Sequence, residues 1–224
     1  MNRFPVITNC NELMNAIHQL GFLPLLESGI PCFNAEAMVA PDCRYVNLPD
    51  GGWEWQLWKW KGPAVTEGDC VYGKFFASKA GFISHEWWPH FFNWRRAIAK
   101  PIEPASIEET ILFTLREHGS MITRDLRRAC GFVGAKMRSR FDSYITRLQM
   151  SCHIITEDFV YPRDRHGNEY GWGLALLTTP EQLLDPDLLQ CNATPDESYR
   201  LIFNHMAELL PFASTAQINR LFKY

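Results

Sequence analysis

The chain has 224 residues, of which 46% are hydrophobic and 21% charged, so it has the apolar side chains for a core and does not resemble a disordered protein. The formal net charge of −3 argues against a protein that binds polyanions over its whole surface. No apolar run approaches the ~20 residues of a membrane span, and the first 21 residues lack the basic start and apolar core of a signal peptide.

The seven cysteines are widely spaced and odd in number, and no two of them form a CxxC motif. This pattern favours neither a disulfide framework nor a metal site, and it is typical of a protein in the reducing cytoplasm. We therefore expect a cytoplasmic protein that binds no membrane, no metal and no cofactor.

The first hundred residues combine one clear helix with an aromatic-rich segment. Apolar residues at helical spacing predict a helix over residues 11–20 that ends at Gly21. Seven of the eight tryptophans lie within residues 53–96. Alternation predicts a strand over residues 53–60, and further patterns predict a strand over 70–76, a turn at 79–81 and a helix over 84–98. So many aromatic side chains are expected to be mainly core.

Residues 101–178 show a different order of elements. A capping box at Ser106 and Glu109 starts a helix that ends at Gly119. An extended piece at 120–122, helices over 124–130 and 135–150, and strands over 152–161 and 170–177 follow. Helix, short strand, two helices and a two-stranded hairpin is the order of a winged helix, a helix-turn-helix variant with a β wing.

We therefore predict an α+β protein with three parts. Residues 1–100 form an aromatic-rich N-terminal module and residues 101–178 a winged-helix domain. Residues 179–224 form an acidic helical tail packed on the same unit, because they hold further capping boxes and an excess of carboxylates.

The charge distribution points to the winged helix as the functional part. Residues 123–150 hold seven basic and two acidic side chains. In helix 135–150 one face is apolar, and Lys136, Arg140, Ser143 and Arg147 form a polar stripe beside it. In a winged helix this helix enters the DNA major groove, where Arg pairs with guanine and Lys holds phosphates. The wing tip adds Arg163 and Arg165. The candidate DNA contacts are Arg95, Arg96, Arg124, Arg127, Arg128, Lys136, Arg138, Arg140, Arg147, Arg163 and Arg165.

Signals for catalysis are sparse. No phosphate-binding glycine-rich loop is present, and His85 and His90 are five residues apart, so they do not share a helical face as zinc ligands do. Glu54 lies between two tryptophans, an environment that raises the pKa of a carboxyl group and suits a general acid or base. Glu86 is a second carboxylate among aromatic residues.

The segment 71–96 resembles the AlkZ family of bacterial DNA glycosylases, which remove alkylated or crosslinked bases and are built from winged helices. The resemblance rests on Ala80-Gly81-Phe82-Ile83-Ser84, on Trp88-Pro89 and on Trp94-Arg95-Arg96, and extends over about residues 12–180. Leu20-Gly21-Phe22-Leu23 is similar to the Leu-Gly that precedes the family's catalytic pair. In this register the pair falls on Pro24 and Leu26, and the family's Glu and His fall near Lys74 and Ser78.

These departures shape three hypotheses about function. The resemblance implies a DNA-binding scaffold, whereas Pro24 and Leu26 are unable to position a water molecule or stabilise a sugar cation. The first hypothesis is a DNA-binding protein with a role in DNA repair that lacks the family's catalytic residues. The second is an active glycosylase with a different acid or base, Glu54 or Glu86. The third is a protein-interaction module without a nucleic-acid role, in which the acidic tail neutralises the basic stripe.

Overall fold

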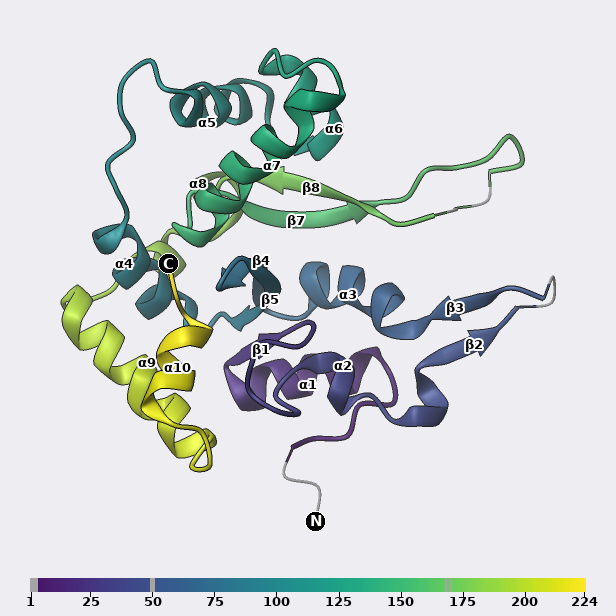
Figure 1. The fold of residues 1–224 in the computed structure, drawn as a ribbon, viewed down its shortest axis with the longest axis vertical. Helices are drawn as coiled ribbons and strands as arrows, with labels where there is room; N and C mark the ends of the chain where they lie inside the picture. Colours follow the sequence, from purple (N-terminus) through teal and green to yellow (C-terminus); the bar gives the residue numbers. More distant parts are fainter. Residues whose placement is uncertain (1–3, 49–50, 168, 170) are drawn as a thin grey trace.

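The computed structural model describes residues 4–48, 51–167, 169 and 171–224, with the backbone alone for residues 135 and 136. It combines helices with one six-stranded and one two-stranded antiparallel sheet (Figure 1), which confirms the predicted α+β class. None of the described helices is both long and apolar enough to cross a lipid bilayer.

The N-terminal half alternates short helices and strands. Its elements are α1 (Cys10–Leu20), β1 (Phe22–Pro24), α2 (Ala35–Met38), the 3-10 turn η1 (Pro41–Cys43), β2 (Tyr45–Asn47), β3 (Trp53–Trp55), α3 (Gln56–Glu67), β4 (Cys70–Phe76), β5 (Lys79–Ser84) and α4 (Trp88–Ile98). The side chain of Asn9 caps α1 and Gly21 ends it with φ +72°, as the sequence predicts.

The second half begins with the predicted series of elements. They are α5 (Ile107–His118), β6 (Met121–Ile122), α6 (Thr123–Ala129), α7 (Ala135–Met150), β7 (Ile155–Val160) and β8 (Leu174–Thr178). The strand β6 pairs with β8, and β8 pairs with β7. The tail adds α8 (Pro180–Leu183), the 3-10 turn η2 (Pro186–Leu189), α9 (Pro195–Leu209) and α10 (Thr215–Leu221).

The large sheet runs through both halves of the chain. Its strand order is β1-β5-β4-β7-β8-β6, and Tyr72 opposite Thr156 joins β4 to β7. Two hydrophobic clusters cover it: one combines residues 7–94, 152–159 and 202–222, and the other combines α5, α6, α7 and their strands. Because one sheet runs through both hydrophobic clusters, the predicted domain boundaries at residues 100 and 178 remain a prediction.

Two local predictions in the aromatic segment are wrong. The strand predicted over residues 53–60 ends at Trp55, and the helix α3 starts at Gln56, because the side chains it buries (Leu57, Lys61 and Ala64) recur at helical spacing. The turn predicted at 79–81 lies at Ala77 and Ser78 instead, both with positive φ, and residues 79–84 are the strand β5.

Candidate nucleic-acid interface

The helix α7 presents one apolar and one polar face. Phe141, Ile145 and Leu148 are buried in the second hydrophobic cluster, with Met137 and Tyr144 packed against it, as the helical spacing predicts. The opposite face is exposed at 138–140, 142 and 143. On the side toward the large sheet, Lys74 of β4 donates a hydrogen bond of 2.9 Å to the Thr146 hydroxyl. These contacts fix the direction of the polar face.

Two exposed arginines, two residues apart and therefore on different sides of the helix, stand out near the start of α7. Arg138 and Arg140 are exposed, and within the described part of the chain neither forms an ion pair or a hydrogen bond. Lys136 lies in the first turn of α7, and its side chain is outside the described residues. Within the described residues, the positive charges of Arg138 and Arg140 therefore have no carboxylate partner.

Arg147, at the C-terminal end of the polar stripe predicted from the sequence, contacts other residues of the protein. Its guanidinium donates to the Glu108 carboxylate of α5 at 2.8 Å and lies 4.5 Å from the centre of the Tyr144 ring. An exposed pair of this kind contributes only about 0–1 kcal/mol, so it is able to exchange its partner. In this structure, however, Arg147 pairs with the Glu108 carboxylate, whereas Arg138 and Arg140 have no carboxylate partner among the described residues.

The remaining predicted contacts fall on α6 and on the hairpin. Arg124 and Arg128 both lie near Asp125, at 3.0 and 4.0 Å, while Arg127 is half-buried. On the hairpin tip Arg163 lies 3.4 Å from Glu169. Arg165 is exposed and donates to the His166 ring at 3.0 Å.

Arg95 is not available for a phosphate contact, so its prediction is wrong. Its side chain is completely buried, and the guanidinium donates to the carbonyl oxygens of Phe75 at 3.2 Å and Phe222 at 2.7 Å. Burial away from water lowers the Arg95 pKa to about 10. Arg96 is half-buried; it donates to the Cys152 carbonyl at 3.1 Å and pairs with Glu181. Both arginines stabilise the fold at the junction of α4 and the tail.

Most of the acidic tail lies away from the first turns of α7, although Tyr224 lines a cavity together with Arg147. Its longest helix, α9, packs along α4, and Figure 1 shows α9 and α10 at the opposite end of the molecule from α6 and α7. Within the described residues, the ion pair Arg96–Glu181 joins the tail to the rest of the chain, and no ion pair joins it to α7 or the hairpin. Among the described residues, therefore, no ion pair links a carboxylate of the tail to Arg138 or Arg140.

The carboxylates considered for catalysis lie in different places. Glu54 lines a cavity beside α3, where Lys59 pairs with it at 3.1 Å and Gln56 donates to it at 3.3 Å. Glu86 lines a separate depression between α4 and α9, together with His90 and Cys191, whose sulfur lies 3.3 Å from the His90 ring. The structure does not bring Glu54 and Glu86 together, so each of them would act alone.

The sequence resemblance singled out Pro24, Leu26, Lys74 and Ser78, and the structure shows where each of them lies. Pro24 is buried in β1 opposite Gly81, and Leu26 follows it with an exposed apolar side chain. Lys74 donates to Thr146, and the Ser78 hydroxyl lies 3.2 Å from the Met150 sulfur. No cluster of three metal-ligating side chains occurs among the described residues.

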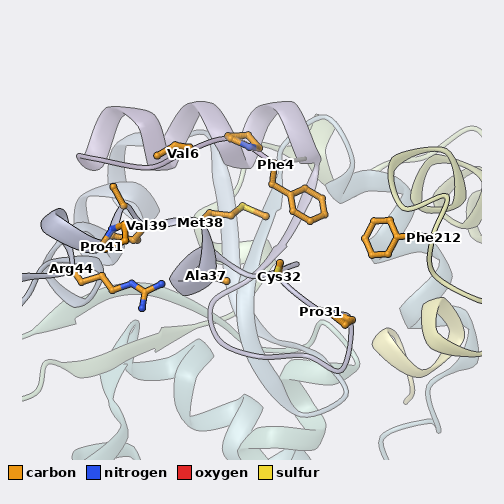
Figure 2. A pocket seen from close by; sticks show the side chains of 12 residues that line it. Phe4, Val6, Pro31, Cys32, Ala37, Met38, Val39, Pro41, Arg44 and Phe212 are labelled. Carbon is orange, nitrogen blue, oxygen red and sulfur yellow. The ribbon is translucent and has the colours of Figure 1, made fainter. Parts of the chain in front are cut away.

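A further cavity, of about 670 Å³, opens near residue 4 (Figure 2). Its lining is mainly apolar and includes Phe4, Met38 and Phe212, with the charged side chain of Arg44 at one side. None of the predicted DNA contacts reaches it. The cavity and the basic face of α7 are therefore separate features.

A family model described as AlkZ related matches residues 7–223, nearly the whole chain. The chain belongs to the AlkZ-related family. This match agrees with the motifs in residues 71–96 and extends the likeness through the tail. The search of curated proteins and the search of solved structures found no match to this AlkZ-related protein.

The structure of this AlkZ-related protein also brings together residues that sequence patterns did not single out. Lys61 is buried in the aromatic segment, with its ammonium 3.2 Å from the centre of the Trp58 ring. Trp172, the one tryptophan outside residues 53–96, lies against Trp55 and Trp58. The helical spacing of Leu57, Lys61 and Ala64 was the sequence signal that could have predicted the burial of Lys61. Trp172 had no such signal, because its neighbours lie more than 100 residues earlier.

Proposed function

We propose that this AlkZ-related protein binds DNA through a winged helix formed by residues 107–178. The order α5-β6-α6-α7-β7-β8, with β6 paired to the second strand of the hairpin, is that of a winged helix. In this arrangement α7 is the helix that enters the major groove. The chain between β7 and β8 is the wing, which contacts the DNA backbone.

The observation that carries this proposal is the free positive charge at the start of α7. Arg138 and Arg140 are exposed and unpaired in the part of the chain that the structure describes, and the acidic tail lies elsewhere. Arg163 and Arg165 extend the positive charge onto the wing. A protein-interaction module with a neutralised stripe is the alternative, and the position of the tail speaks against it.

Removing the two free arginines of α7 is expected to weaken DNA binding. Arg138→Ala with Arg140→Ala should raise the Kd for duplex DNA by about 30-fold or more, since each contact to a base or phosphate contributes ~1–3 kcal/mol. The slope of the logarithm of the association constant against the logarithm of the salt concentration is negative, and its magnitude should decrease by about 1.8. Fluorescence anisotropy titrations with a labelled duplex at two salt concentrations measure both quantities.

The matched control is Arg200→Ala with Arg220→Ala, two exposed arginines of the tail. It removes the same net charge from the opposite end of the molecule, so its Kd should stay within about twofold of the wild-type value. Equal losses in both double variants would indicate that net charge alone matters. Absence of wild-type binding to duplex, mismatched and single-stranded DNA at low salt would rule out the proposal.

We propose further that the protein does not cleave glycosidic bonds with the residues its family uses for this purpose. Pro24 and Leu26 have no side-chain group that donates or accepts a proton. Alkylated DNA incubated with the protein should release bases no faster than buffer controls, as measured by chromatography of free base. Release above background that disappears in Glu54→Gln or Glu86→Gln, but not in Glu36→Gln, would support the alternative of an active glycosylase.

A further inference from the structure

Two arms project from one side of the molecule. One is the small sheet of β2 and β3, and the other is the chain between β7 and β8 (Figure 1). A cavity of about 380 Å³ lies between them and is lined by residues from both. The first arm and the start of α3 contribute Trp53, Trp55 and Trp58, and the second contributes Tyr161 and Trp172. Segments more than 100 residues apart thus form one aromatic site.

The rings of this site have a defined arrangement. Trp55 and Trp58 are stacked, with ring centres 5.4 Å apart and 18° between their planes. Trp172 stands perpendicular to both, at 6.4 and 5.0 Å. Beneath them, the buried ammonium of Lys61 lies 3.2 Å from the Trp58 ring centre, and Tyr161 donates a hydrogen bond of 3.3 Å to the Trp58 carbonyl. The floor of the cavity is therefore fixed before any ligand binds.

The upper part of the site is open to solvent. Trp172 is 58% exposed and Trp53 is 60% exposed, although such side chains usually bury most of their area. Exposed apolar surface of this size on adjacent arms marks a binding site. Gly173 supports the position of Trp172, because a Cβ atom there would lie 2.9 Å from Cζ of Tyr161. Only glycine permits this close approach of the chain to the ring.

Charge pairing makes the cavity compatible with a polyanion. Its two carboxylates each have a cationic partner: Lys59 lies 3.1 Å from Glu54, and Arg163 lies 3.4 Å from Glu169. The carboxylates retain free lone pairs that accept hydrogen bonds from exocyclic amino groups. Arg165 on the same arm is exposed and has no ion pair among the described residues, so its charge is available to a phosphate backbone.

We propose that this cavity binds an unpaired nucleobase of a DNA strand, held against the faces of Trp172 and Trp53. Exposed indole faces beside arginine side chains are the chemistry of single-stranded nucleic-acid sites, where bases stack on aromatic rings irrespective of sequence. This inference rests on the proposed DNA binding and adds that the protein prefers DNA with an extruded or unpaired base. The exocyclic amino group of a base would donate a further hydrogen bond to the Glu54 or Glu169 carboxylate.

The test compares a fully paired duplex with the same duplex carrying one bulged 2-aminopurine. Wild-type protein should bind the bulged duplex at least fivefold more tightly and quench 2-aminopurine fluorescence by stacking. Trp172→Ala should reduce this preference to less than about twofold, with an unchanged Kd for the paired duplex. Trp172→Phe, which keeps a ring, should restore part of the preference and of the quenching.

The control variant is Phe113→Ala, which removes a 59% exposed aromatic side chain from α5, away from both arms. It should leave both affinities unchanged. Equal wild-type affinity for paired and bulged duplexes, or an equal effect of Trp172→Ala on both, would overturn the aromatic site while the winged-helix proposal stands. Failure of wild-type protein to bind either duplex would overturn both.

Discussion

Replacing Arg95 with alanine is expected to destabilise the protein by about 3 kcal/mol or more. The side chain is completely buried, and its guanidinium lies 4.5 Å from the centre of the Trp94 ring. Alanine would leave a cavity and remove the donor for the carbonyl oxygens of Phe75 and Phe222. Large-to-small core changes cost 3–5 kcal/mol, and each unsatisfied buried acceptor costs ~1–3 kcal/mol. Urea unfolding at pH 7 measures the change through the shift of the midpoint.

A second variant separates volume from charge. Arg95→Met fills most of the space and also removes a cation whose pKa is lowered to about 10 by burial. Because a buried charge is costly, this variant should lose less than half of the stability lost by Arg95→Ala. Arg220→Ala, on the exposed surface of α10, should change stability by less than about 0.5 kcal/mol. A loss below 1 kcal/mol in Arg95→Ala would contradict the role of this contact.

Lys61 should make the stability of the protein depend on pH in the neutral to mildly basic range. Burial lowers its pKa from 10.5 to about 7. Between pH 7 and 10.5 the unfolded chain therefore binds the proton that the folded chain has released, and stability rises with pH. At 1.36 kcal/mol per pKa unit, Lys61→Met should be more stable than wild type by about 2–4 kcal/mol at pH 6. This difference should shrink as the pH approaches 9.

The comparison with Lys61→Met is needed because other groups act in the opposite direction. Burial raises the pKa of the Cys70 and Cys152 thiols to about 12, so their contribution to stability is lost at high pH. Both proteins contain these thiols, so the difference between the free energies of unfolding of wild type and Lys61→Met does not contain the contribution of the thiols. Lys100→Met, an exposed lysine, should show a flat difference across the same pH range. A flat difference for Lys61→Met as well would show that its ammonium is solvated in the folded state.

The sequence predicted those elements whose signals are local. The capping hydroxyl of Ser106 accepts from the Glu109 amide, and α5 follows it as expected. The face of α7 that carries Phe141 and Ile145 was predicted from helical spacing alone. The strand over residues 53–60 failed because tryptophans are common in both strands and helices, and the decisive signal was the buried spacing of the side chains between them.

The site was predicted only in part, for the same physical reason. Spacing within α7 places Arg140 in the polar stripe, whereas Arg138 was predicted from its charge alone, and the structure exposes both. Whether an arginine is free depends on segments far away: the carbonyl of Phe222, 127 residues later in the chain, binds Arg95, and Glu108 of α5 pairs with Arg147. Such contacts follow from tertiary packing and leave no local pattern. The contacts of Trp172 with Trp55 and Trp58 also follow from tertiary packing and have no local pattern.

The first hydrophobic cluster, which joins residues 7–94 to residues 202–222, has a consequence for the order of events during synthesis. A ribosome adds roughly 5–20 residues per second, so the hundred or so residues between these segments take ~5–20 s to be made. During this time Phe22, Phe91 and Trp94 lack Phe222, the ring that later packs against all three. The nascent chain thus carries an incomplete aromatic core for seconds, which makes it a natural client for chaperones that hold apolar surface.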